Sequence, residues 1–346
     1  MVVDAAALAQ TVEAIRAIQT SSGCIPHTPG AKADPWNHVE AAMALDAGGR
    51  HADAERAYRW LASIQRRDGA WEAGRQDDEV VDPTLDANFS AYVATGVWHH
   101  YLAARDETFV AGMWPVVERA VDFMLDLQTP TGVVMWARDA RYEPWPGALL
   151  TSSSCIFLSL RCAIAIAEML ERDRPDWELS LELLGRAVAT EDGLFEPKRR
   201  FSMDWYYPVL SGVVQGDAAA RRLEERWDEF VVGGLGVRCV SNRPWITSGE
   251  SAELVITLAA TGLREEAKIL YGWIQHLRSD DGGYWMGATF PDGKVWPREK
   301  PAWGSGAVVL AADALLPSSP TSALFDGRSL PEIPDFSIQR AVSDPT

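Results

Sequence analysis

The chain has 346 residues, 47% hydrophobic and 23% charged, as expected of a globular protein with a large core. Its net charge of −17 disfavours nucleic-acid and anionic-membrane partners. The four cysteines are far apart and form no Cys-x-x-Cys pair, so we expect no metal site, and no motif indicates a cofactor. The N-terminus lacks a signal-peptide pattern and no apolar run reaches about 18 residues, so we expect a cytoplasmic protein. Nothing in the sequence indicates an oligomeric state.

Apolar residues at helical spacing predict six pairs of helices along the chain. In the first pair, a helix at 5–19 is followed by one that starts at Asp34 and ends near Leu45. Asp34 is a candidate N-cap and Pro35 suits the first helical position. The predicted first helices of the other pairs are 51–65, 109–128, 177–189, 218–232 and 264–277. Their second helices are predicted at 86–101, 155–170, from 204, 253–260 and 307–316.

A glycine follows the first helix of each pair, at intervals of roughly 40 to 65 residues, which is typical of helix-pair repeats. These glycines are Gly23, Gly69, Gly132, Gly193, Gly236 and Gly282. The second helices lack a polar face and should be buried, whereas the first helices carry charge on one face and should lie outside. The pattern therefore predicts an all-α fold, the (α/α)6 barrel, over residues 1–317. An open solenoid is the alternative, but it would leave the apolar last helix without a neighbour. Residues 318–346 form a tail rich in proline and serine.

If the inner helices run parallel, their N-termini meet at one end of the barrel and form a polar cup. The carboxylates and aromatic rings expected there suit a carbohydrate, whose rings stack on indoles and whose hydroxyls bind carboxylates. The side chains predicted to line this cup are Asp34, Trp36, Asn37, His38, Asp86, Asn88, Ser152, Ser153, Asp204, Trp205, Tyr206, Tyr207, Trp245, Glu250, Lys300 and Trp303.

Hydrolysis of a glycosidic bond needs one carboxylic acid and one carboxylate, and Asp34 and Glu250 are the best candidates. Each lies at the start of an inner helix beside a tryptophan. Because they belong to units one and five, we expect a gap of roughly 6.5–9.5 Å between the carboxyl groups, which favours inversion. We assign Glu250 as the acid and Asp34 as the base, although the opposite order is open. Asp34 could also serve only as a helix cap, Glu250 could complement the helix dipole, and His38 could be a wall residue.

Two stretches resemble the Q-W repeats of squalene and hopene cyclases. They are Gln65-Arg66-Arg67-Asp68-Gly69-Ala70-Trp71 and Gln128-x-x-x-Gly132-x-x-x-Trp136. This resemblance extends to the prenyltransferase-like (α/α)6 superfamily and implies the fold more than the chemistry. A terpenoid- or prenyl-processing enzyme is therefore an alternative. Its acidic motif would have to be Asp77-Asp78-Glu79-Val80-Val81-Asp82, which lacks the helical spacing of such sites.

The segments Asp34-Pro35-Trp36-Asn37-His38-Val39-Glu40 and Trp245-Ile246-Thr247-Ser248-Gly249-Glu250 resemble a different group. This is the family of actinobacterial prenyltransferase-like proteins that includes the mycobacterial methylmannose polysaccharide hydrolases. The resemblance covers nearly the whole chain. It implies an inverting, endo-acting hydrolase of α-1,4-linked mannosides, with Asp34 and Glu250 at the catalytic positions. Two alternatives remain: a carbohydrate-binding barrel without activity, and a sugar epimerase, which would need paired histidines where only His38 is suitably placed.

Overall fold

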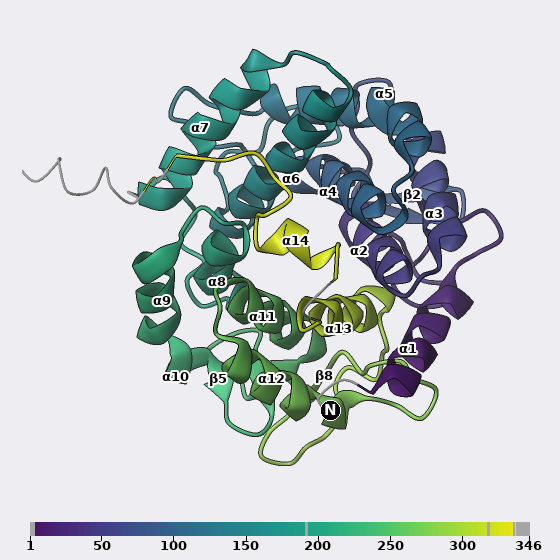
Figure 1. Ribbon diagram of the computed structural model, residues 1–346, viewed down its shortest axis with the longest axis vertical. Helices are drawn as coiled ribbons and strands as arrows, with labels where there is room; N and C mark the ends of the chain where they lie inside the picture. The colour runs from purple at the N-terminus through teal and green to yellow at the C-terminus, as the bar shows by residue number, and fades with distance from the viewer. Residues whose placement is uncertain (1–3, 191–192, 317–318, 335, 337–346) are drawn as a thin grey trace, which may run out of the picture.

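The computed structural model describes residues 4–190, 193–316, 319–334 and 336, and arranges most of them in two concentric rings of helices (Figure 1). The inner ring consists of α2 (Pro35–Ala47), α4 (Ala87–Ala104), α6 (Leu150–Met169), α8 (Met203–Leu210), α11 (Ser248–Ala260) and α13 (Ala302–Ala314). The outer ring consists of α1 (Ala5–Ile18), α3 (His51–Ser63), α5 (Glu107–Leu125), α7 (Pro175–Thr190), α9 (Gly216–Glu225), the short α10 (Trp227–Phe230) and α12 (Arg264–Trp273), which a 3-10 turn at Ile274–Leu277 extends.

The inner ring is closed. Helix α2 packs on α4, α4 on α6, α6 on α8, α8 on α11, α11 on α13, and α13 returns to α2. This last contact confirms the predicted (α/α)6 barrel and shows that the open solenoid is wrong. Closure buries the apolar flanks of the last helix against those of the first inner helix, which supplies the neighbour that α13 requires.

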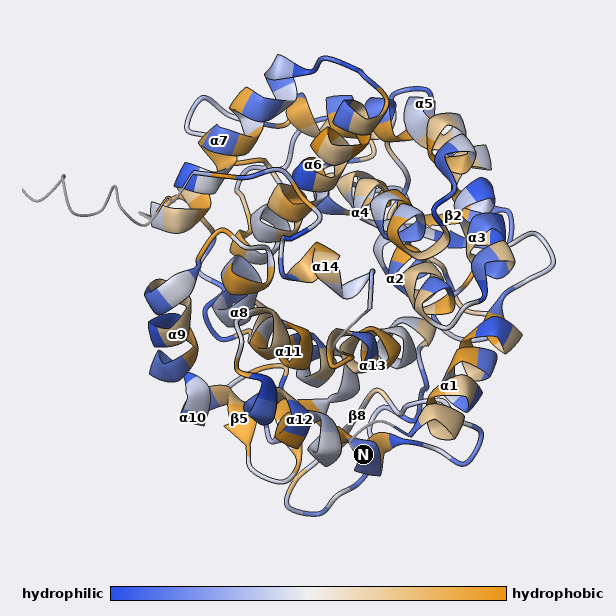
Figure 2. Cartoon of the chain, in the orientation of Figure 1, coloured by the Kyte–Doolittle hydropathy of each residue, from blue (hydrophilic) through white to orange (hydrophobic). Residues whose placement is uncertain are grey.

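The division into inner and outer helices follows polarity. Hydrophilic residues face outward on α3, α7 and α9, whereas the inner helices are largely apolar (Figure 2). In the part of the chain that the structure describes, α6 alone is long and apolar enough to cross a membrane, but 94% of its apolar window is buried inside the barrel. A core helix of a globular protein has the same properties, so this helix gives no independent indication of a membrane.

Several inner helices begin earlier than the sequence pattern predicts. Helix α6 begins at Leu150 rather than Cys155, α11 at Ser248 rather than Glu253, and α13 at Ala302 rather than Ala307. Small polar residues fill these first turns. Polar side chains give no apolar signal, so apolar periodicity does not detect these turns; one of the hydroxyls, on Ser154, donates back to the Leu150 carbonyl at 2.8 Å. The helix predicted at 218–232 ends instead at Phe230, after a break at Arg226.

Short antiparallel strands, which the sequence pattern does not predict, tie the loops together in front of the inner helices. They are β1 (Gly74–Gln76), β2 (Glu79–Asp82), β3 (Leu85–Asp86), β4 (Ala137–Arg138), β5 (Val231–Val232), β6 (Gly236–Arg238), β7 (Trp245–Thr247) and β8 (Gly287–Thr289). Strand β3 pairs with β4 from the next unit, and β5 to β8 form one sheet in chain order. The first pairing joins the loops that lead into α4 and α6, and the four-stranded sheet joins the loops that lead into α11 and α13. We call this end of the barrel the mouth.

The Q-W stretches join neighbouring outer helices. The Gln65 side-chain nitrogen donates to the carbonyls of Gly69 and Val116, each at 2.9 Å, and the Trp71 indole donates to the Leu61 carbonyl at 2.8 Å. Gly69 has a positive φ of 92°, and a Cβ there would overlap the Arg119 carbonyl of α5. Equivalent joints occur at Gln19 with Gly23 and at Gln128 with Gly132. We call this arrangement the glutamine–glycine joint, and it explains the motif as a structural brace.

The C-terminal segment closes the end of the barrel opposite the mouth. Helix α14 (Ser322–Phe325) lies in the centre of the ring in Figure 1 and packs on α11 and α13. Near it, the Asp313 carboxylate at the end of α13 accepts hydrogen bonds from the Ser319 and Thr321 hydroxyls, each at 2.6 Å. The predicted boundary between barrel and tail, after residue 317, lies outside the described residues. The described part of the tail is packed onto the barrel.

Candidate active site

Three inner helices present acidic side chains at the mouth, two of them as helix N-caps and the third in the first turn. Asp34 caps α2: one oxygen accepts from the Asn37 backbone N–H at 2.9 Å and the other from the Asn37 side chain at 2.7 Å. Asp86 caps α4 and accepts from the Phe89 N–H at 3.0 Å. In the first turn of α11, Glu250 accepts a hydrogen bond from the Thr247 hydroxyl at 2.5 Å. The caps satisfy free N–H groups and fix the direction of each carboxyl group.

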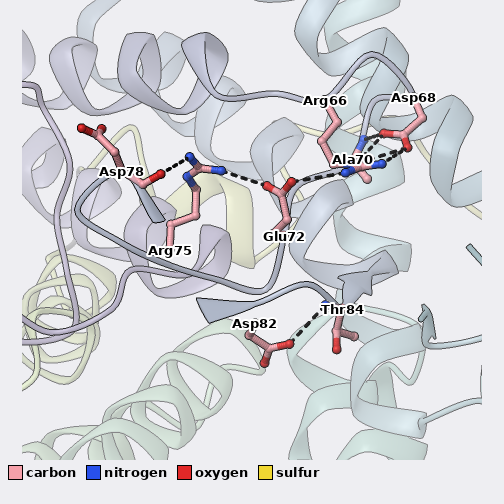
Figure 3. A network of polar contacts seen from close by, with 8 residues as sticks. All are labelled: Arg66, Asp68, Ala70, Glu72, Arg75, Asp78, Asp82 and Thr84. Carbon is pink, nitrogen blue, oxygen red and sulfur yellow. Dashed lines mark hydrogen bonds and ion pairs between the residues drawn. The ribbon is translucent and has the colours of Figure 1, made fainter. Parts of the chain in front are cut away.

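The loop between α3 and α4 supports Asp34 from the side. Ala33, directly before Asp34, exchanges two backbone hydrogen bonds with Arg75, of 2.7 and 2.9 Å. Glu72 accepts one hydrogen bond from Arg75 and another from Arg66, at 3.3 and 3.2 Å, and this chain of ion pairs stiffens the loop (Figure 3).

The acidic run that begins at Asp77 lies in the β1–β2 hairpin of the same loop. Val80 and Val81 within it are 43% and 49% exposed. This is an exposed turn with no helical spacing, so it lacks the geometry that a diphosphate-binding aspartate motif requires.

Asp34 and Glu250 share one electrostatic environment. Both are only 7% exposed, and the negative charges of both raise the pKa of the same buried residue, Glu40. Burial also raises the pKa of Asp34 to about 6, although the hydrogen bonds from Asn37 oppose the shift. Burial raises the pKa of Asp86 to about 7 in the same way. Units one and five therefore contribute their acids to the same end of the barrel.

Trp36 is the aromatic centre of the mouth. It is partly exposed, and its ring centroid lies 5.9 Å from that of Phe89, 6.0 Å from that of Tyr92 and 6.2 Å from that of Tyr207. These partners belong to α4 and to α8, which lies across the ring from α2. Trp36 therefore extends over the barrel axis between the acids of α2 and the tyrosines of α8, where an indole face can support a sugar ring.

Two residues that the sequence placed in the cup are packed into the wall instead. His38 is fully buried: its Nδ1 accepts from the Ile25 N–H at 3.0 Å and its Nε2 lies 2.9 Å from the Ala57 carbonyl. Burial lowers its pKa to about 4, so the ring is neutral at pH 7. Trp205 is 1% exposed, stacks on Phe230 and donates to the Arg222 carbonyl at 2.7 Å. Neither side chain has surface available for a sugar.

Tyr206 and Tyr207 are also buried, and both hydroxyls donate to the carboxylate of Glu253, with Tyr207 at 2.6 Å. Asp204 accepts from the Thr151 hydroxyl at 2.7 Å. The Trp303 ring packs over Gly249, the residue before Glu250, where a Cβ would overlap it. These contacts make the tyrosines and Trp303 supports for α11 rather than surfaces for a ligand.

The other predicted cup residues differ in accessibility. Asn88 is 2% exposed, and its side-chain oxygen has no hydrogen-bond partner among the described residues. Lys300 forms an ion pair with Asp281 at the edge of the barrel. Trp245 is partly exposed and donates to the Trp296 carbonyl at 2.6 Å. Of the three, Trp245 and Lys300 are partly exposed, and Asn88 is buried.

Sequence reasoning missed four residues at this end of the barrel. Glu40 and Glu253 lie below the acids on the same helices, and the spacing of three between Glu250 and Glu253 was a usable signal. Trp145 and Trp296 are 45% and 58% exposed on the loops that follow β4 and β8. Their positions in long polar loops gave no such signal. Within the described ranges, no three His, Cys, Asp or Glu side chains are grouped so that they could hold a metal ion.

A closed ring of six helix pairs, with carboxyl groups and indoles gathered at one mouth, defines an (α/α)6-barrel glycoside hydrolase. Sequence comparison supports this class. The chain is 45% identical over 324 residues to the MMP endo-(1,4)-3-O-methyl-alpha-D-mannosidase of Mycolicibacterium hassiacum, across 93% of this chain and 89% of the relative. The chain therefore belongs to the family of this endo-mannosidase. No family model matches it.

Solved structures show the same fold at low sequence identity. A glycosidase in complex with glucose superposes with a TM-score of 0.72 at 18% identity, covering 90% of this chain and 97% of its own. A sugar epimerase from a ruminal bacterium superposes with a TM-score of 0.65 at 10% identity, covering 87% and 95%. These likenesses establish the barrel. Because the chain belongs to the mannosidase family, it is a glycoside hydrolase. The terpenoid-processing and binding-only alternatives are therefore rejected.

Proposed function

We propose that this chain is an inverting, endo-acting hydrolase of α-(1,4)-linked mannose polysaccharide that carries 3-O-methyl groups. The observation that carries the proposal is the 45% identity, over 93% of the chain, to a relative named for that reaction. The arrangement at the mouth supports it, because two buried acids from separate helices and a partly exposed indole lie at the same end of the barrel. A methylated sugar is more apolar than an ordinary one and suits an aromatic surface.

In the proposed reaction, Glu250 donates a proton to the glycosidic oxygen as the bond from that oxygen to the anomeric carbon breaks. Asp34 takes a proton from a water molecule that attacks the opposite face of the anomeric carbon. The hydrogen bonds from Asn37 to both oxygens of Asp34 favour its carboxylate form, as a base requires. Glu250 has the Thr247 hydroxyl as its neighbour, which helps to hold the acid in place.

The direct test is to incubate the protein with a 3-O-methylated α-(1,4)-mannan and follow the anomeric protons by NMR. We expect oligosaccharides from internal cleavage, and a β-anomer as the first product. Unmethylated α-(1,4)-mannan and α-(1,4)-glucan are the matched controls, and we expect slower cleavage of both. A first product with the α-configuration would contradict inversion, and release of single sugars from one end would contradict the endo mode.

The environment of Asp34 predicts the acid side of the pH profile. A base with a pKa of about 6 is lost by protonation below that value, so kcat/KM should fall as the pH drops through about 6. Replacing Asn37 with Ala removes a hydrogen bond to the Asp34 carboxylate. This change raises the pKa of Asp34, so the acid limb should move to higher pH, by roughly half a unit to one unit. Steady-state kinetics from pH 4.5 to 8 measure the shift, and an unmoved limb would contradict the assignment of Asp34 as the base.

Trp145 and Trp296 are exposed tryptophans on the loops that follow β4 and β8, and we expect them to bind sugar units beyond the cleavage point. The loop of Trp145 is held by a 2.9 Å hydrogen bond from its N–H to Ala137 of β4. Trp296 is held through its carbonyl by the Trp245 indole. Replacing either tryptophan with Ala should raise KM for long substrates roughly threefold to tenfold and leave kcat nearly unchanged. Ile269→Ala, at a 54% exposed position on the outer helix α12, is the control and should leave KM unchanged.

A further inference from the structure

At the end of the barrel opposite the mouth lies a cavity of about 470 Å³, which we call the basal cavity. Its volume is within the range of small-molecule sites, roughly 300–1,000 Å³. The ends of inner helices, the start of α9 and the described part of the tail form its wall. The lining includes Arg161 of α6, Val209 of α8, Ala260 of α11, Phe325 of α14, and Gln215 and Gly216 at the start of α9.

Arg161 places a buried positive charge beside this cavity. The residue is only 5% exposed. Its Nη2 donates to the Pro331 carbonyl at 2.9 Å, whereas its Nε has no hydrogen-bond partner among the described residues. Burial lowers the pKa of the guanidinium, and the group that opposes this shift is the Cys162 thiol rather than a carboxylate. An arginine side chain stays charged in proteins, and a buried charge is costly without a partner of opposite sign.

The acidic side chains around the basal cavity do not supply that partner. Asp326 lines the cavity but forms an ion pair with Arg328 at 2.7 Å and accepts from the Arg328 backbone N–H at 3.1 Å. Glu332 lines it and is exposed to solvent, as is Asp217 in the first turn of α9. In the described ranges, none of these carboxylates forms an ion pair with Arg161. Its donors are therefore available to an anion from outside the chain.

The start of α9 adds a second source of donors. Gly216 lines the cavity, and the side chain of the N-cap residue Gln215 forms no capping hydrogen bond. The N–H groups of a first turn have no partner within their own helix and carry the positive end of its dipole, so they favour an anion. At Gly212 a Cβ would lie 3.2 Å from Nη1 of Arg161, so glycine at this position keeps space beside the guanidinium.

We propose that the basal cavity binds a small molecule through an oxyanion, a phosphate or carboxylate group, held by Arg161 and by the first turn of α9. A planar guanidinium matches the oxygens of either group, and the Pro331 carbonyl occupies only part of its donors. The cavity is larger than a phosphate needs, so the rest of the bound molecule has room beside Val209 and Ala260. This site lies at the opposite end of the barrel from Asp34 and Glu250, and the inference does not depend on the proposed hydrolysis.

The test is calorimetric titration of the full chain with inorganic phosphate at fixed ionic strength, where we expect a single phosphate to bind per chain. Arg161→Met removes the charge but keeps an unbranched side chain, and it should weaken phosphate binding roughly tenfold or more. The matched control is Arg105→Met, since Arg105 is an exposed arginine directly after α4 at the same end of the barrel. It should leave the affinity unchanged. Equal affinity of Arg161→Met and wild type would overturn the proposal.

Two further probes distinguish the sources of the oxyanion. Tighter binding of acetate than of phosphate, lost in Arg161→Met, assigns a carboxylate ligand. Tighter binding of mannose 6-phosphate than of phosphate, lost in the same variant, assigns a phosphorylated sugar. If none of the three probes binds to wild type, the proposal is wrong and Arg161 serves only to hold Pro331.

A second measurement does not require Arg161→Met to fold. In protein with 15N-labelled arginine, the Nε–H signal of Arg161 is assigned by its loss in Arg161→Lys. This signal should shift during the phosphate titration with the same midpoint as the heat of binding. If circular dichroism shows that Arg161→Met is unfolded, this measurement decides, and an unmoved Arg161 signal overturns the inference. If wild type cleaves no methylated mannan, the proposed function fails while both measurements still test the basal cavity.

Discussion

Asp34→Asn and Glu250→Gln should each lower kcat on a methylated α-mannan by roughly a thousandfold or more, since each removes a proton-transfer group from the reaction. Both changes keep the size of the side chain. Asn is as good a helix cap as Asp, so the side chain at position 34 can still accept from the Asn37 N–H. Gln at position 250 can still accept from the Thr247 hydroxyl. The loss of activity should therefore occur in folded protein, which circular dichroism and thermal melting verify.

A matched control exists in the outer ring. Asp106 caps α5 through a 2.9 Å hydrogen bond from the Phe109 N–H, in the same geometry as Asp34, but far along the chain from either acid. Asp106→Asn should retain wild-type kcat. Normal turnover in Asp34→Asn or in Glu250→Gln would reject the pair. If both variants bind substrate with unchanged affinity and do not cleave it, the pair acts in the chemical step and not in binding.

Gly69→Ala should be among the most destabilising single changes in the outer ring. The residue has a φ of 92°, a conformation that costs a side-chain-bearing residue roughly 1–2 kcal/mol. The new Cβ would also overlap the Arg119 carbonyl, which is backbone of a packed helix and cannot move aside easily. Overpacking adds roughly 1–3 kcal/mol, so we expect a total loss of about 2–5 kcal/mol in the free energy of unfolding, measured by urea denaturation.

Gly234→Ala separates the two contributions. Gly234 also has a positive φ, of 78°, but a Cβ there would meet nothing within 4 Å. It should therefore lose only the backbone contribution, roughly 1–2 kcal/mol. The difference between the two variants measures how tightly the glutamine–glycine joint holds α3 against α5. Equal losses would mean that the close approach at Gly69 contributes nothing to the stability of the ring.

Local sequence signals located the helix pairs and the cap of α2, although three inner helices begin earlier than predicted. Asp34 followed by Pro35 predicted the start of α2 to the residue, because capping and the fixed φ of proline depend on neighbours in the chain. The repeated glycines located the turns after several outer helices, since a positive φ is a local requirement. Two of these glycines do not take part in a glutamine–glycine joint. A Cβ on Gly193 would meet nothing within 4 Å, and a Cβ on Gly236 would meet the Ser251 hydroxyl and not the backbone of a neighbouring outer helix.

Residue orientation was harder to predict on helices that are apolar on every side. Such a helix has no polar stripe to show which residues face the axis, so His38 and Trp205 were placed in the cup although they lie in the wall. The short strands were missed for a related reason. Strand β7 at 245–247 pairs with β8 at 287–289, and two- or three-residue strands are specified by the partner loop and not by their own pattern.

By itself, the sequence determined that this protein is a barrel of six helix pairs with its acidic helix starts at one end, because capping, turn geometry and amphipathic spacing act over a few residues. Only the tertiary structure decided which side chains meet inside that end. Glu40 and Glu253 come together with Tyr206 and Tyr207 because ring closure brings α2, α8 and α11 to one axis. Contacts between residues so far apart in the chain depend on how whole helices pack, and no local pattern encodes that packing.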